Sequence, residues 1–345
     1  MSSLRKKLTL GLMAASSSMV TPALDLISTA RADQQIATLP GQPGGDPGPD
    51  TKTGQDMLLR GRYEDAITAS KRALSRDERY VPAMIVMAKA YYYLKKYELA
   101  SAILDISKGI DPNNAEAFNL IGFLALANSD KISATAAFKK ATELKPDFGN
   151  AWNNLAVEYC ESKNYEAAVP AAEKATQLSP TFAKAWLNLG SAYRGQMRYP
   201  DAERAYRKAL ELQPQYPEAY FDLGILYLDA KEMPGMDLQA KLSTAIQHLT
   251  KYKEQASFRL AKDDPSDGFM EEARKEIERE VKRLERVAKQ KERDKAKAAQ
   301  PPPAPAPGAA PGDAPKSAVP PAGGTTAPAP DEPGGIKSAP GTGGK

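Results

Sequence analysis

An alanine recurs every 34 residues through the middle of this 345-residue chain, at Ala66, Ala100, Ala134, Ala168 and Ala202. A proline column keeps the same spacing, at Pro112, Pro146, Pro180 and Pro214. So does a column of large apolar residues, at Met84, Phe118, Trp152, Trp186 and Tyr220. A fixed period of this length predicts stacked copies of one small unit rather than a single catalytic globule.

Each period contains the pattern of two helices. In one unit, an apolar face at i, i+3, i+4 and i+7 is formed by Trp152, Leu155, Ala156 and Tyr159. This spacing is typical of one face of a helix. After a polar break, a second apolar face follows and ends at Pro180, which lacks the N–H that a continuing helix needs. The small residues of the alanine column allow the two helices to approach closely.

The marked positions of one unit resemble the tetratricopeptide repeat (TPR) signature: Trp186, Leu189, Gly190, Tyr193, Tyr199, Ala202, Tyr206, Ala209 and Pro214. Counting in 34s places unit starts at Pro47, Val81, Ala115, Gly149, Ala183 and Pro217. The first unit departs from the family because its leading half has little apolar face, and the last departs after Tyr227. The resemblance implies an all-α fold, a right-handed superhelical solenoid of about six helix-turn-helix units over residues 51–262.

A long charged helix is predicted over residues 268–299. Its thin apolar stripe consists of Met270, Ala273, Ile277, Val281, Leu284 and Ala288. We expect this helix to cap the last repeat, covering its open apolar face with a polar exterior. A coiled coil is the alternative. Residues 300–345 contain thirteen prolines and no aromatic residue, which predicts a disordered tail that acts as a spacer. A tether that crosses peptidoglycan or docks its Pro-rich segments on a partner is the alternative.

The N-terminus has the layout of a secretory signal peptide. Basic residues 5–7 precede an apolar run over residues 8–20, and Ala30-Arg31-Ala32 offers a cleavage site. An uncleaved anchor is the alternative, but the apolar run is too short to span a bilayer. We therefore expect a signal peptide over residues 1–32, cleavage near Ala32, a periplasmic location and no integral membrane span. Residues 33–50, rich in Gly and Pro, are expected to form a flexible leader.

The chain contains few of the residues that catalysis by a nucleophile and a base would need. Cys160 and His248 are its single cysteine and single histidine, so a Cys/His metal cluster cannot be assembled. We expect Cys160 to be a small filler and His248 a surface residue. No metal site, no cofactor and no enzyme activity are predicted. The formal net charge of +4 predicts no strong attraction to nucleic acid.

Function is therefore expected in binding surfaces. In the TPR family, the first helix of each unit lines a concave groove, chiefly through its second, fifth, ninth, twelfth and thirteenth positions. Carried onto this sequence, the predicted groove consists of Ile85, Lys89, Tyr92, Tyr93, Asn119, Phe123, Leu126, Asn150, Asn153, Val157, Lys184, Leu187, Ser191, Arg194, Phe221, Ile225 and Leu228.

Chaperone-docking members of the family clamp a peptide carboxylate with Lys and Asn side chains, and part of that set is present here as Asn154, Lys184, Asn188 and Arg194. The Lys/Asn pair of the first clamp unit is missing, because Ile85 and Lys89 hold those places. A groove with apolar ends better suits an amphipathic helix or an extended peptide.

Two functional hypotheses follow. The first is a non-catalytic periplasmic adaptor whose groove binds a peptide or helix of another cell-envelope protein. Its layout resembles the repeat proteins of bacterial gliding-motility complexes and similar envelope machines. The second is a self-assembling structural component of the envelope, with the groove filled by its own C-terminal helix or by a second copy.

Overall fold

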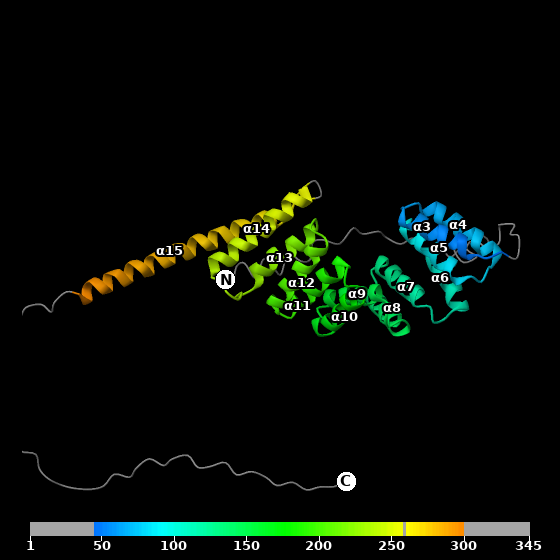
Figure 1. Ribbon diagram of the computed structural model, residues 1–345, viewed down its shortest axis with the longest axis horizontal. Coiled ribbons are helices and arrows are strands. Elements are labelled where there is room, and N and C mark those ends of the chain that lie inside the picture. The colour runs from blue at the N-terminus through cyan, green and yellow to red at the C-terminus, as the bar shows by residue number, and fades with distance from the viewer. Residues whose placement is uncertain (1–44, 258–259, 300–345) are drawn as a thin grey trace, which may run out of the picture. The chain divides into compact units, whose positions relative to one another are not determined.

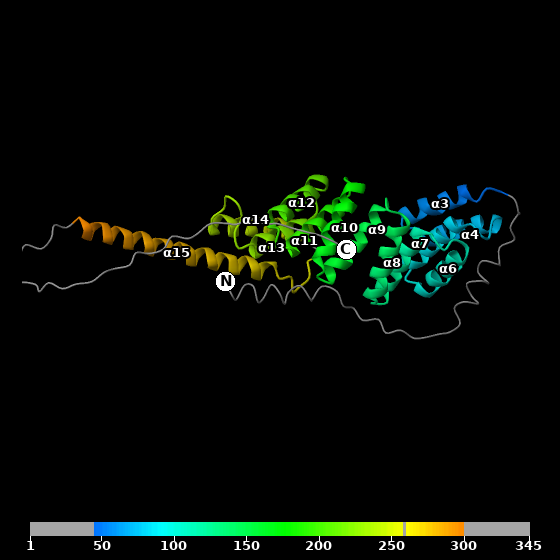
Figure 2. The same ribbon diagram turned by 90° about the horizontal axis from the view of Figure 1, so that it is seen from below.

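The computed structural model describes residues 45–257 and 260–299. The chain divides into two units, residues 1–288 and 289–345. The described part of the second unit is the end of one helix, and all its side chains are exposed. The first unit holds the repeats (Figures 1 and 2).

The described residues form helices and no strand. The first helices of the six repeats are α3 (Gly48–Leu59), α5 (Val81–Tyr93), α7 (Ala115–Ala127), α9 (Gly149–Glu161), α11 (Ala183–Gly195) and α13 (Pro217–Asp229). The second helices are α4 (Tyr63–Arg76), α6 (Tyr97–Ile110), α8 (Lys131–Leu144), α10 (Tyr165–Leu178), α12 (Tyr199–Leu212) and α14 (Leu238–Ala256). One further helix follows, α15 (Ser266–Ala298). The five first helices after α3 begin at the predicted unit starts, and the predicted all-α repeat solenoid is confirmed.

Two of the sequence columns meet in space. The indole Nε1 of Trp152 donates a hydrogen bond to the carbonyl oxygen of Pro146 at 2.9 Å. Trp186 makes the same bond to Pro180 at 2.8 Å. Because proline ends the preceding helix and tryptophan begins the next, this bond fixes the angle at which one repeat follows another. In these two repeats the proline column and the apolar column are thus joined by a direct hydrogen bond.

Helix pairs within a repeat fit by matched volumes. A Cβ atom added to Gly122 on α7 would lie 2.5 Å from Cε1 of Phe138 on α8, so only glycine admits this ring. In the next repeat the corresponding residues are Ala156 and Ala172, both buried. The third repeat therefore combines a glycine with a large ring, and the fourth combines two alanines at the same positions.

The first repeat has a polar outer face. Lys52 and Asp56 are exposed on α3. In later repeats the corresponding positions carry Val86 and Leu124, which are buried. Terminal repeats of solenoids need such a polar face, because no neighbour covers them. This explains why the first unit departs from the family pattern. Helix α3 begins at Gly48, so the predicted leader boundary at residue 50 is wrong by three residues.

Helix α15 caps the last repeat, as predicted. Phe269, Met270 and Ala273 are buried in one cluster with Leu242 and Leu249 of α14. From residue 282 onward every described side chain is exposed, and Leu284 of the predicted stripe is 48% exposed. Two i,i+4 ion pairs stabilise its surface, Glu271–Lys275 at 2.6 Å and Glu278–Lys282 at 2.5 Å.

The predicted signal peptide (1–32), most of the predicted leader (33–44) and the predicted tail (300–345) lie outside the described residues. Within the described ranges, no helix combines the length and the apolar character needed to cross a bilayer.

Candidate functional site

The predicted groove residues lie on α5, α7, α9, α11 and α13, one helix after another. Five of them do not line an accessible surface, because neighbouring helices bury them: Ile85, Asn153, Leu187, Ile225 and Leu228. Three are exposed, namely Tyr93, Asn150 and Lys184, and the rest are half-buried. We call this row of first-helix positions the first-helix face.

The C-terminal end of the first-helix face is occupied by the fold itself. Ile225 and Leu228 belong to the core cluster that also contains Phe269 and Met270 of α15. The ring of Phe221 packs edge-on against Tyr252 of α14, with 5.0 Å between ring centroids. The expectation of an apolar groove at this end is therefore corrected for Ile225 and Leu228, because both side chains are buried in the core of the last repeat.

Asparagines in the middle of the face bind one another. Asn154 Nδ2 donates to Asn119 Oδ1 at 2.9 Å, and Asn188 Nδ2 donates to Asn153 Oδ1 at 2.8 Å. Each bond joins one repeat to the next with the same offset in sequence. These amides, which the clamp comparison offered as ligand groups, hold the repeats together.

Arg194 is likewise engaged by its neighbours. Its Nη1 lies 2.8 Å from Oδ2 of Asp229, and its side chain is only 18% exposed. Burial raises the pKa of nearby Asp222 to about 6, although the Arg194 charge lowers it. Arg194 therefore neutralises carboxylates between the last two repeats. Of the four side chains in the clamp comparison, only Lys184 is exposed.

The N-terminal end of the face carries connected aromatic rings. Tyr63 stacks on Tyr93 with 5.0 Å between centroids, and Tyr93 meets Tyr92 edge-on at 5.6 Å. Tyr92 also contacts Tyr97 at 5.7 Å and Phe123 at 5.9 Å. We call Tyr63, Tyr92, Tyr93 and Tyr97 the tyrosine ladder. Tyr93 is 55% exposed, so aromatic surface is accessible here.

The stack of Tyr93 on Tyr63 occupies a recurring contact between repeats. The last residue of a first helix meets the first residue of the preceding second helix. In later repeats this contact pairs Glu161 with Lys131 at 3.2 Å, and Gly195 with Tyr165, whose ring lies 2.2 Å from a Cβ added to the glycine. The same contact between neighbouring repeats is thus made by stacked rings in one repeat, by an ion pair in another, and by a ring packed on a glycine in a third. Periodicity alone does not reveal this contact, because the residue type at the end of the first helix changes from repeat to repeat.

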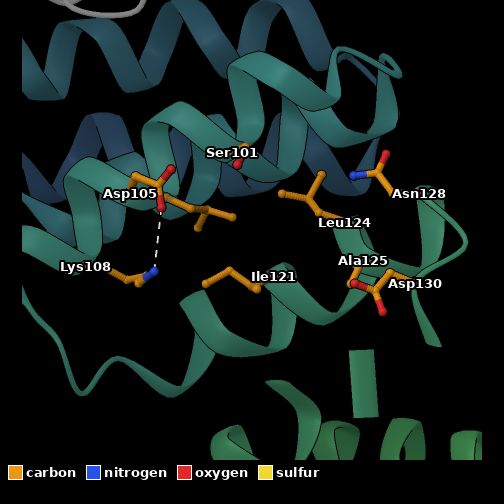
Figure 3. A pocket seen from close by; sticks show the side chains of 9 residues that line it. Ser101, Asp105, Lys108, Ile121, Leu124, Ala125, Asn128 and Asp130 are labelled. Atoms are coloured by element: carbon orange, nitrogen blue, oxygen red, sulfur yellow. Dashed lines mark ion pairs between the residues drawn. The ribbon is translucent and has the colours of Figure 1, made fainter. Parts of the chain in front are cut away.

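A hollow of about 230 Å³ lies between α6 and α7 (Figure 3). It is lined by Ser101, Leu104, Asp105, Lys108, Ile121, Leu124, Ala125, Asn128 and Asp130. Pockets for small organic ligands usually measure ~300–1,000 Å³. The hollow is smaller than this range and contains none of the predicted groove residues, so we assign it no ligand.

The single cysteine and the single histidine are both packed into the fold. Burial, with Glu161 adding to it, raises the pKa of half-buried Cys160 to about 12, as suits a filler. His248 is not the surface residue predicted. Its ring lies parallel to that of Tyr227 at 5.7 Å, and its Nδ1 is buried without a partner among the described residues. Burial, then the charges of Arg207 and Lys251, lower the pKa of His248 to about 4. Within the described ranges, no three His, Cys, Asp or Glu residues gather as a metal site would need.

Four tetratricopeptide repeat family models match the chain, at residues 57–122, at 115–148, at 137–169 with 205–247, and at 183–216. Together they cover about half of its length. The chain belongs to the tetratricopeptide repeat family. No curated protein matches it in sequence. As a TPR protein, it has the fold of a scaffold for binding other proteins or peptides.

Solved structures show the same fold. The type IV pilus biogenesis factor PilW is 18% identical, with a TM-score of 0.52 over 64% of this chain and 96% of that chain. PilF of Pseudomonas aeruginosa is 17% identical, with a TM-score of 0.51 over 65% and 93%. The APC/C hetero-tetramer Cut9–Hcn1 is 16% identical, with a TM-score of 0.56 over 71% and 46%. At these identities the likeness concerns the fold alone.

Proposed function

We propose that this TPR protein is a non-catalytic adaptor of the bacterial cell envelope. Its first-helix face binds a peptide or helix of another envelope protein. One observation carries the proposal: the face stays accessible at Tyr93, Asn150 and Lys184, on three different repeats, while a polar surface covers each end of the repeat array. Accessible positions spread from the second repeat to the fifth suit a linear ligand lying along the array.

The envelope location rests on the sequence. The basic residues, apolar run and Ala30-Arg31-Ala32 site support export to the periplasm. A gliding-motility or similar envelope machine is the setting that we propose. Edman sequencing of the protein from its native envelope tests the location: Asp33 should be the first residue, and an intact Met1 would reject export.

The self-assembling alternative has one observation in its favour. Helix α15 buries Met270 and Ala273 against the last repeat, so a C-terminal segment of this chain does pack on the repeat array. The cover is confined to the last repeat, because Lys184 one repeat earlier is exposed. We therefore favour a partner from outside the chain for the remaining repeats.

In-cell crosslinking followed by mass spectrometry tests the adaptor. Lys184→Glu on α11 should reduce crosslinking to the envelope partner several-fold, because it reverses an exposed charge on the first-helix face. Lys139→Glu is the matched control, since Lys139 is exposed on a second helix, α8. Circular dichroism should be the same for both variants. Equal crosslinking by both would reject the face as the binding site. Arg194 and Phe123 are unsuitable test positions, because Arg194 pairs with Asp229 and Phe123 packs on Tyr92, each in a neighbouring repeat.

A further inference from the structure

The hydroxyl groups and the exposed ring of the tyrosine ladder are available to bind a ligand. Its hydroxyl groups make no hydrogen bond to any other residue in the described part of the chain. Lys95 and Lys96, directly after Tyr92 and Tyr93 in the chain, are exposed. The ladder therefore offers the exposed ring of Tyr93, O–H donors that bond no other described residue, and a positive edge in one place.

This combination suits a proline-rich ligand. Aromatic-lined surfaces bind polyproline II segments, because the flat proline ring packs on an aromatic face. The polyproline II backbone makes no internal hydrogen bonds, so its carbonyl groups need donors from outside. Tyrosine hydroxyls supply such donors. An amphipathic helix would leave them unused, because its backbone carbonyls are already bonded within the helix.

The chain itself contains a segment of this chemistry. Its last 46 residues, 300–345, contain thirteen prolines, and residues 328–333 read Pro-Ala-Pro-Asp-Glu-Pro. The two acidic residues of this segment complement Lys95 and Lys96. We propose that the tyrosine ladder of one copy binds the proline-rich segment 328–333 of a second copy. This contact goes beyond the partner adaptor, because it links copies of the protein to one another.

Sedimentation velocity of the purified protein over a wide concentration range tests the proposal. The natural protein should self-associate as its concentration rises. Tyr93→Ala should weaken the association about ten-fold, which corresponds to the loss of one good contact. Replacing Pro328, Pro330 and Pro333 together by alanine should abolish it while keeping both acidic residues. Met197→Ala is the matched control, since Met197 is a 73% exposed apolar residue outside the ladder, and this variant should associate normally.

Lys96→Glu provides a variant that leaves the ring contacts intact. It should weaken association, and added salt should weaken association of the natural protein in the same direction. A protein that stays monomeric throughout, or a triple alanine variant that associates like the natural protein, would overturn the proposal. Either result leaves the adaptor untouched, because its test uses Lys184 and a different partner. Conversely, loss of the Lys184 effect with association intact would refute only the adaptor.

Discussion

The fit between Gly122 and Phe138 gives a quantitative test of how these repeats pack. A methyl group at position 122 would lie 2.5, 2.7 and 2.8 Å from three atoms of the Phe138 ring. That ring is fully buried and is also held edge-on by Phe123. Overpacking of a core costs roughly 1–3 kcal/mol, and alanine regains about 1 kcal/mol over glycine in a helix. The difference between these two effects is about 0–2 kcal/mol, and because the ring is fully buried we expect Gly122→Ala to lower the free energy of unfolding by up to about 2 kcal/mol.

Substituting Phe138 removes volume from the same contact instead of adding it. Phe138→Ala leaves a cavity and should cost roughly 3–5 kcal/mol. In the double variant, the added methyl group of residue 122 enters the space that the ring leaves. This reproduces the natural pair of Ala156 and Ala172 in the next repeat. The double variant should therefore be more stable than the sum of the single effects by about 1–3 kcal/mol.

Urea unfolding followed by circular dichroism measures all four proteins, with one unfolding scheme fitted throughout. Gly109→Ala is the control, because a Cβ atom at this exposed site on α6 would meet nothing within 4 Å. It should raise stability by up to about 1 kcal/mol. A Gly122→Ala variant that gains stability like the control would refute the reasoning. The reasoning would also be refuted if the changes in unfolding free energy of the two single variants summed to that of the double variant within about 0.5 kcal/mol.

Three further predictions follow from buried groups. Burial lowers the pKa of His248 to about 4 in the folded protein, so as the pH falls this histidine is protonated first in the unfolded chain. The free energy of unfolding should therefore not depend on His248 above about pH 6.5, and should fall by about 3 kcal/mol between pH 6.5 and pH 4. The stability difference between the natural protein and His248→Phe, measured across this range, should show that slope, and a flat difference contradicts it. Ser107→Ala should add about 1 kcal/mol of unfolding free energy, because the Ser107 hydroxyl is buried with no hydrogen-bond partner among the described residues. Ser70→Ala should gain less, because the Ser70 hydroxyl donates to a helix carbonyl at 2.9 Å. Equal gains in urea unfolding would contradict this. Gly195→Ala should lower the melting temperature, because its methyl group would enter the ring of Tyr165, and an unchanged melting temperature would show that the ring moves freely.

The parts of this fold that the sequence predicts are those repeated within it. The helix starts at Val81, Ala115 and Gly149 follow from spacing, because each unit solves the same local packing problem. The side chain of His248 was misplaced because its burial depends on the ring of Tyr227, on another helix. Five predicted groove positions proved buried for a related reason. A family position describes an average repeat, and Leu228 lies in the last one, where α15 follows.

The ends of the array constrain every form of association. Lys52 and Asp56 give the first repeat a polar outer face, and α15 covers the apolar face of the last. Stacking of copies end to end would bury these charged groups without partners, which costs more than it gains. End-to-end stacking is therefore disfavoured, and association is expected to use the sides of the array or the sequence segments beyond the repeats. Both proposals meet this condition: one places a foreign peptide near Lys184, and the other places a proline-rich segment on the tyrosine ladder.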